Sequence, residues 1–330
     1  MKKLLAKLLI LLVALFAFSC SGKKYATDEC GCFMDFDDTK YLSKKNSTDF
    51  IVIITNDGDD DNSSNFINKV LKSPDYKSSV LKKYNVIHFD FSQKTFAKTI
   101  IPDDSTEEQI RQADLIQRTA AKGYLISRKL NCQTAPSVFR FNKNGFYVSQ
   151  IFVEPKDYSV SSFVKLIEET NQKSIEFDEK YAATKEGSVV ERMNKIDELF
   201  KSFDLPQKSF ADSLIKDAIN LDKNNESGLV GKYLIYEADN LTTDLCNEKK
   251  YKEASTVYYN IAQNPLVEND DKINCYFYAA YILAMTNDVN EIPQILKCLE
   301  EGKALNPQSD SAIEFDEMYN YFKKLSESIN

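Results

Sequence analysis

The residues of this chain that could do chemistry are its cysteines and one aspartate-rich loop. The loop Asp57-Gly58-Asp59-Asp60-Asp61-Asn62-Ser63 follows an apolar run and carries four carboxylates but no thiol. Thiolates are the nucleophiles of disulfide exchange, whereas clustered carboxylates suit hard cations or the free N–H groups of a helix start. Six cysteines follow residue 20: Cys30, Cys32, Cys132, Cys246, Cys275 and Cys298.

Cys30 and Cys32 are the first redox candidates, because two thiols one residue apart can form a strained, oxidising disulfide. They precede the first predicted core strand, however, and do not lie at a helix N-terminus, where a thiol pKa is lowered. We favour inert thiols, or a disulfide with another cysteine. Cys132 is a third candidate because it lies four residues before Pro136. We interpret it as a structural cysteine.

The aspartates have two interpretations. Asp57, Asp59 and Asp61 alternate like the first ligands of an EF-hand, but the sixth position is Asn62 and the twelfth is Asn68, so an EF-hand is rejected. The preferred interpretation is that the carboxylates cap a helix and oppose its dipole; an irregular cation site is the alternative. No metal site and no cofactor is assigned.

His88 is the only histidine, which excludes a histidine-built metal site. It lies within a strand pattern with no nucleophile motif beside it, so we predict a packed histidine and not a catalytic one. The nine glycines are spread thinly and form no phosphate-binding loop.

Residues 1–19 are predicted to be a signal peptide, because three lysines accompany an apolar stretch too short to span a bilayer comfortably. Ala17-Phe18-Ser19-Cys20 resembles the lipobox of bacterial lipoproteins, although Ala17 and Phe18 depart from the strict pattern. The resemblance implies lipidation of Cys20 and a membrane anchor in the bacterial cell envelope, at the outer membrane on its periplasmic or surface side. The alternative is an ordinary secretory signal. Residues 20–45 are predicted to be a tether and N-terminal flank.

The charge of the chain limits its partners. Without the three lysines of the leader, 39 basic residues face 50 acidic ones, a net charge of −11. This balance argues against nucleic acid or an anionic lipid surface as a partner. Export would permit disulfides.

The elements that must position these residues alternate between strands and helices. A strand, helix, strand, helix order followed by a hairpin predicts an α/β domain with a central mixed sheet and flanking helices. The predicted strands are 50–55, 85–91, 137–141 and 146–152, and the predicted helices are 63–83 with a break near Ser73-Pro74, 107–130 and 160–170.

The apolar strand 50–55 with its turn, the strand 86–90 and the segment 134–141 with its Asn144-Gly145 turn resemble the thioredoxin superfamily. The resemblance implies a thioredoxin-like domain over 46–173 with Pro136 as a cis-proline. It aligns Asp60 and Ser63 with the family's cysteine pair, so redox activity at that position is not expected. The implied peptide-docking surface comprises Asp59, Asp60, Asp61, Asn62, Ser63, Thr134, Ala135 and Pro136. The insertion 92–106 is expected to form a rim over this site.

Residues 174–205 are predicted to be a helical linker and 206–330 an all-α domain of helical hairpins. Lys250-Tyr251-Lys252-Glu253-Ala254, with Tyr258, Ala262 and Pro265, resembles the second helix of a tetratricopeptide repeat, and a plain helical bundle is the alternative. Cys275 and Cys298 are expected in its core.

These features together predict a membrane-anchored cell-envelope lipoprotein whose redox-inactive thioredoxin-like domain binds or scaffolds a protein or peptide partner. An enzyme is the less favoured interpretation. The alternative from another class is a thiol-disulfide oxidoreductase that uses Cys30/Cys32 or Cys132. A third interpretation is a cation-binding protein that uses the aspartate loop.

Overall fold

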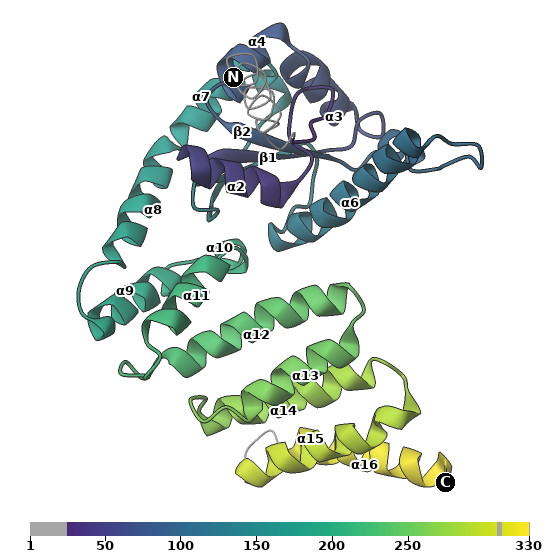
Figure 1. Ribbon diagram of the computed structural model, residues 1–330, viewed down its shortest axis with the longest axis vertical. Helices are drawn as coiled ribbons and strands as arrows, with labels where there is room; N and C mark the ends of the chain where they lie inside the picture. Colours follow the sequence, from purple (N-terminus) through teal and green to yellow (C-terminus); the bar gives the residue numbers. More distant parts are fainter. Residues whose placement is uncertain (1–24, 309–311, 330) are drawn as a thin grey trace, which may run out of the picture. The chain divides into compact units, whose positions relative to one another are not determined.

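The computed structural model describes residues 25–308 and 312–329 (Figure 1). The predicted signal peptide and the predicted lipidation site, Cys20, lie outside the described residues. The chain divides into two compact units near residue 170, with the short segments 125–132 and 146–148 grouping with the second unit.

The first unit contains a mixed sheet of four strands in the order β2-β1-β3-β4. Strand β1 is parallel to β2 and antiparallel to β3. The predicted mixed sheet is therefore confirmed, with β2 ending one residue early and β4 one residue shorter at each end. The strands are β1 Phe50–Thr55, β2 Asn85–Asp90, β3 Ser137–Phe141 and β4 Tyr147–Ile151.

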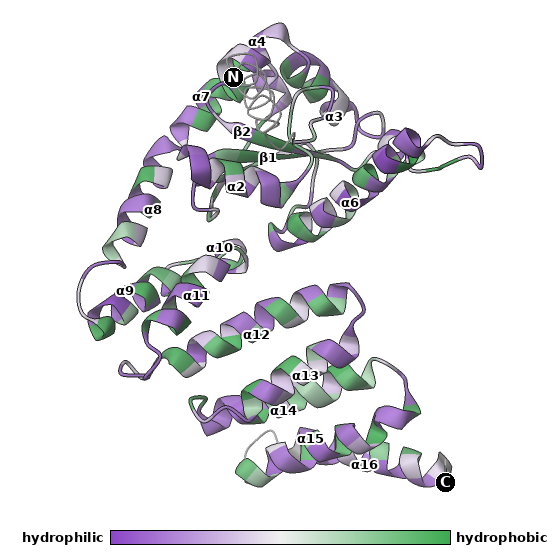
Figure 2. Cartoon of the chain, viewed as in Figure 1, coloured by the Kyte–Doolittle hydropathy of each residue, from purple (hydrophilic) through white to green (hydrophobic). Residues whose placement is uncertain are grey.

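Strand β1 is the centre of this unit. All six of its residues are buried, as its continuous apolar pattern requires of a strand covered on both faces (Figure 2). Its register pairs Thr55 with Asp90 and Ile54 with Ser137. The loops after β1 and β2 and the segment before β3 therefore meet at one edge of the sheet.

The helices of the first unit flank this sheet. The predicted break near Ser73-Pro74 is confirmed, because Ser73 precedes a new helix with Pro74 at its first position. The elements are α2 Phe36–Asn46, α3 Asp61–Phe66, the π-helical η1 Ile67–Leu71, α4 Pro74–Tyr76, the π-helical η2 Lys77–Leu81, α5 Gln93–Ala97, α6 Glu107–Lys129, the 3-10 helix η3 Pro155–Asp157 and α7 Val160–Glu169.

The N-terminal flank is more than the tether that the sequence predicted. Helix α2 begins at the cap residue Asp35 and buries Phe36 against Phe50 and Phe141, with ring centroids 5.6 and 5.7 Å apart. Phe33 extends the sheet at β2, since its N–H donates to the Val86 carbonyl over 2.7 Å. The reason for the difference is the aromatic content of the flank, which needs an apolar partner.

The second unit is built from helices. Consecutive helices from α11 to α16 pack against each other, and buried alanines line the α13 and α14 contacts. Helices end at Leu221 and Leu305, as the sequence indicated. Its helices are α8 Asn171–Ala183, α9 Val189–Lys201, α10 Leu205–Ser209, α11 Asp212–Leu221, α12 Val230–Asn247, α13 Tyr251–Ala262, α14 Asn269–Ala284, the 3-10 helix η4 Val289–Glu291, α15 Ile292–Leu305 and α16 Ala312–Ile329.

The segment predicted as a linker contributes to a core of this unit. Phe177 of α8 stacks on Phe203 at 5.4 Å, and Phe200 of α9 packs edge-on against Tyr233 of α12. Cys275 and Cys298 are buried in the core of α13–α16, as expected. Within the described ranges no helix is both long and apolar enough to cross a membrane.

The packing of α2 predicts that Phe36→Ala lowers the free energy of unfolding by about 3 kcal/mol, because a fully packed aromatic ring leaves a cavity. Thermal denaturation of the full-length chain measures the change. Tyr41→Ala is the matched control, because this side chain on the same helix is 56% exposed. Equal melting temperatures for the two variants would contradict a structural role for the flank.

Candidate functional site

The aspartate loop forms the start of α3 at the edge described above. Asp60 is the N-cap, and its Oδ2 accepts the Ser63 N–H at 2.7 Å. Asp59 Oδ2 accepts the N–H of Gln93, the first residue of the short helix α5, at 2.7 Å. The insertion thus contacts the loop, as expected of a rim. Asp61 and Asn62 are exposed on the first turn.

Ser63 occupies the position that the sequence aligned with a family cysteine. Its side chain is fully buried, and its Oγ has no hydrogen-bond partner among the described residues. Strand β3 pairs with the end of β1 through Ser137 and Ile54, and the Ala135–Pro136 peptide just before β3 is cis, as expected. Thr134 is exposed, and its carbonyl accepts the Ser137 hydroxyl. The two predicted binding segments therefore lie at one sheet edge.

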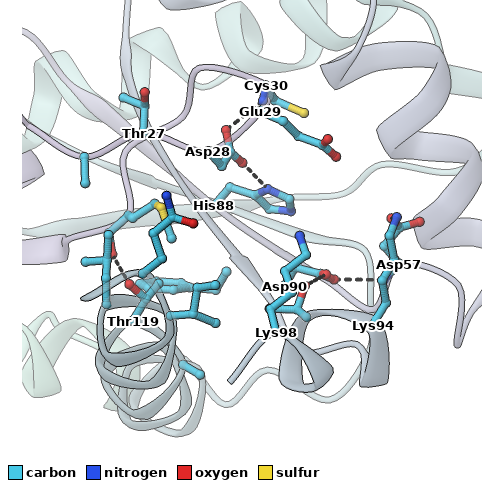
Figure 3. A pocket seen from close by; sticks show the side chains of 18 of the residues that line it. Thr27, Asp28, Glu29, Cys30, Asp57, His88, Asp90, Lys94, Lys98 and Thr119 are labelled. Atoms are coloured by element: carbon cyan, nitrogen blue, oxygen red, sulfur yellow. Dashed lines mark hydrogen bonds and ion pairs between the residues drawn. The ribbon is translucent and has the colours of Figure 1, made fainter. Parts of the chain in front are cut away.

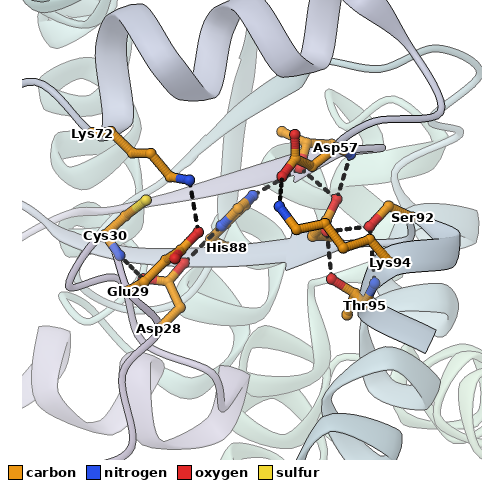
Figure 4. Close-up of polar contacts among 11 residues, drawn as sticks. Asp28, Glu29, Cys30, Asp57, Lys72, His88, Ser92, Lys94 and Thr95 are labelled. Atoms are coloured by element: carbon orange, nitrogen blue, oxygen red, sulfur yellow. Dashed lines mark hydrogen bonds and ion pairs between the residues drawn. The ribbon is translucent and has the colours of Figure 1, made fainter. Parts of the chain in front are cut away.

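A chain of polar side chains begins beneath this edge, at the end of β1 (Figure 4). The buried Thr55 hydroxyl lies 2.8 Å from His88 Nε2, and His88 Nδ1 lies 2.7 Å from Asp28 Oδ2. The other Asp28 oxygen accepts the N–H groups of Cys30 and Cys32 at 2.9 Å. His88, on β2, thereby links the N-terminal segment to the end of β1.

Asp90 completes this network on the opposite side of Thr55. Its Oδ1 accepts the Thr55 hydroxyl at 3.0 Å and the Asp57 N–H at 2.8 Å. Its Oδ2 accepts the hydroxyls of Ser92 and Thr95 at 2.6 and 2.5 Å. Four donors from three segments of the chain therefore converge on this one carboxylate.

The Thr55 hydroxyl lies between His88 Nε2 and Asp90 Oδ1, and it has one hydrogen to donate. It therefore links the two side chains of β2 to the end of β1.

The Asp28–His88–Thr55 arrangement has the hydrogen-bond order of an acid–base–hydroxyl triad. Thr55 is fully buried on β1, however, and does not line the neighbouring cavity. A nucleophile must reach its substrate, and this hydroxyl cannot. The arrangement therefore connects the N-terminal segment to β1 and β2, and the His88 side chain, which is 8% exposed, lies in the wall of the neighbouring cavity.

A cavity of about 600 Å³ lies beside this network (Figure 3). It is lined by the N-terminal segment, the loop after β1, η1, β2, α5 and α6, and His88 lies between the labelled Asp28 and Asp90 in its wall. Side chains of α6 such as Leu115 and Ile116, together with Phe89, give it an apolar wall. Its volume is typical of a small-molecule site, which spans about 300–1,000 Å³.

Ion pairs neutralise most charged groups around the cavity. Lys94 Nζ lies 2.8 Å from Asp57 Oδ2, and this contact lowers the pKa of the Asp57 carboxyl. Lys72 Nζ lies 2.9 Å from Glu29 Oε1, and this contact raises the pKa of Lys72. Lys98 lines the cavity and has no side-chain hydrogen bond or ion pair in the described part of the chain.

The thiols beside the cavity are poorly suited to redox chemistry. Cys30 and Cys32 are buried and unpaired. Burial, reinforced by Asp28, raises the pKa of Cys30 to about 12 and that of Cys32 well above its usual range. Cys32 Sγ instead contacts the Tyr76 hydroxyl at 3.4 Å. Cys132 lies just beyond the end of α6 and is partly exposed.

The aspartates of the loop do not converge on one point. Asp57 and Asp59 face Lys94 and the Gln93 N–H of α5, while Asp60 faces its own helix. In the described ranges no group of three or more His, Cys, Asp or Glu side chains is arranged to hold a metal ion.

Comparison with known proteins identifies relatives for part of the chain. Residues 229–327 match a family model described as an uncharacterised protein C-terminal domain. A Treponema pallidum (strain Nichols) protein, described only as uncharacterized, is 26% identical over 119 residues, which are 36% of this chain and 39% of the relative. A solved structure titled DsbH oxidoreductase covers 47% of this chain and 98% of its own, at 14% identity and a TM-score of 0.32. That likeness is too low to define the fold.

The thiol environment predicts slow alkylation of native Cys30 by iodoacetamide. A pKa of about 12 in place of 9.0 makes the neutral-pH thiolate fraction about a thousandfold smaller, and the thiolate becomes abundant only as the pH approaches 12. Mass spectrometry of tryptic peptides after timed alkylation between pH 6 and 8 measures the rate of Cys30 modification. The urea-unfolded chain is the control. Rapid modification of Cys30 at pH 6 would contradict this assignment and favour an oxidoreductase.

Proposed function

We propose that the first unit is a thioredoxin-like domain that binds protein or peptide partners without thiol chemistry. The observation that carries the proposal is the pairing of a cysteine-free helix start, with Asp60 as its cap and Ser63 buried, with the cis Ala135–Pro136 peptide at the same sheet edge. Both segments of the peptide-docking surface are present, but the two positions aligned with the cysteine pair are Asp60 and Ser63.

Two further observations support binding over catalysis. Disulfide exchange needs an accessible thiolate, and burial keeps Cys30 and Cys32 protonated. The segment before β3 has exposed groups, with Thr134 at its start. An extended peptide can pair its backbone with such a segment, because main-chain hydrogen bonds supply affinity for many sequences.

The second unit supplies another binding surface under this proposal. Its stacked antiparallel helices resemble tetratricopeptide repeats, with Ala254, Ala262 and Ala279 buried where neighbouring helices approach. Stacked helical pairs present extended surfaces that bind partners. The leader and Cys20 complete the proposal as a lipid-anchored protein of the bacterial cell envelope.

Restoring the missing cysteines tests the thioredoxin-like geometry. We expect Asp60→Cys/Ser63→Cys to form an intramolecular disulfide and to catalyse insulin reduction by dithiothreitol, because the helix start lowers the first thiol's pKa. The matched control, Asp61→Cys/Ser64→Cys, keeps the spacing but shifts the pair by one residue. Mass spectrometry and insulin turbidity measure both. Equal behaviour of the two variants would contradict a thioredoxin-type turn.

Hydrogen exchange tests the binding itself. A soluble extract of bacterial cell envelopes should slow amide exchange in residues 59–66 and 134–139 of the full-length chain, because a docked peptide excludes water from that edge. Thr134→Arg should remove this protection. Asn68→Arg, an equal change of charge at an exposed helical position, should keep it. Protection confined to the second unit would assign binding to its helices, and none anywhere would refute the proposal.

A further inference from the structure

We propose that the cavity beside His88 is a separate binding site for a small organic cation, an amine with an apolar body. The cavity measures about 600 Å³, and all the residues that line it belong to the first unit. It is distinct from the proposed peptide surface, since none of Asp59 to Ser63 and none of Thr134 to Pro136 lines it. The proposal therefore goes beyond the proposed function and does not depend on it.

One part of the cavity wall is apolar. Leu115, Ile116 and Ala120 come from α6, the helix that carries the labelled Thr119 in Figure 3. Phe89 of β2 adds an aromatic ring to the wall. Burial of apolar area against these side chains supplies affinity whatever the charge of the ligand, while a few polar groups fix its orientation. The charged part of the wall therefore decides the ligand class.

The charged groups of the wall differ in sign according to their depth. Carboxylates outnumber ammonium groups, with Asp28, Glu29, Asp57, Asp90 and Glu108 against Lys94 and Lys98. Although ion pairs neutralise most of these groups, the Asp28 and Asp57 side chains are only 19% and 16% exposed, whereas that of Lys94 is 58% exposed. Lys98 is exposed as well. Water screens the exposed ammonium groups more strongly than the shielded carboxylates, so the interior of the cavity favours a cation.

The shielded carboxylates can accept further donors. A carboxylate has about four lone-pair sites, and Asp28 uses three of them, for the N–H groups of Cys30 and Cys32 and for His88. The hydrogen bond from Lys94 lowers the pKa of the Asp57 carboxyl, which is therefore an anion at neutral pH. An ammonium group has three donors, so it gains contacts with such oxygens and removes no donor that they already have.

Lys94 competes with the proposed ligand. Its Nζ lies 2.8 Å from Asp57 Oδ2, so a ligand ammonium group at Asp57 meets a carboxylate that already holds one positive charge. Removing the lysine charge should strengthen the binding of an amine and weaken that of an anion. The sign of this effect distinguishes a cation site from an anion site.

Three ligands with one apolar body test the proposal: phenylbutylamine, phenylbutanol and phenylbutyrate. Saturation-transfer NMR and titration calorimetry on the full-length chain measure their binding. We expect the amine to bind about fivefold more tightly than the alcohol, and the carboxylate to bind most weakly. Lys94→Gln should strengthen the binding of the amine about threefold. Lys45→Gln, which changes an exposed lysine of α2 outside the cavity, should leave it unchanged.

Further variants locate the two ends of the ligand. Asp57→Asn should remove most of the amine's advantage over the alcohol. Asp61→Asn, the same change of charge at an exposed position of the same loop, should retain that advantage, because Asp61 does not line the cavity. Leu115→Trp should fill the apolar part of the cavity and weaken all three ligands, with circular dichroism confirming the fold.

Each outcome supports or overturns one part of the proposal. A carboxylate that binds as tightly as the amine, or a loss of amine affinity in Lys94→Gln, would overturn the ligand class. Equal effects of Asp57→Asn and Asp61→Asn, unchanged binding in a folded Leu115→Trp, or no binding by any of the three ligands would overturn the site. The charge variants test the proposal even where Leu115→Trp does not fold.

Discussion

The structure of the first unit depends on how the buried hydroxyl of Thr55 is paired. Strand β1 is covered on both faces, and a polar group at its end must find partners inside the protein. It finds His88 and Asp90, both on the adjacent parallel strand β2. Both side chains have further polar atoms that also need hydrogen-bond partners. His88 therefore contacts Asp28 in the N-terminal segment, and Asp90 accepts from Ser92 and Thr95 at the start of α5.

The cavity follows from this network. Asp28 is held by His88 on one side, while Asp90 holds the start of α5 on the other, and α6 closes the space between them. The same arrangement buries Cys30 and Cys32, whose N–H groups share an oxygen of Asp28. The charge of Asp28 and the burial of the thiols both disfavour a thiolate. One set of contacts thus forms part of the cavity wall and keeps the nearby thiols protonated and unreactive.

The comparisons cover the two units unequally. The family match lies within the second unit, at residues 229–327, and brings no activity with it. The first unit has distinctive geometry of its own: a buried serine at a helix start, a cis Ala135–Pro136 peptide before the strand that pairs with β1, and a polar network at the end of β1. These sites bear on function more directly than the fold does, because one fold serves many functions.

The sequence by itself determined the strands and their order, because the apolar run 50–55 can be satisfied only by burial and the Asn144-Gly145 turn fixes a hairpin. It also determined that the aspartate loop lacks a redox pair, since no cysteine occurs there. Only the tertiary structure decided which partners Asp28 and His88 have. The two residues lie 60 positions apart in the chain and neither belongs to a motif, so their hydrogen bond leaves no local sequence pattern. The burial of Cys30 and Cys32 was likewise decided in three dimensions, because it depends on a flank whose docking site is formed by strands that follow it in the chain.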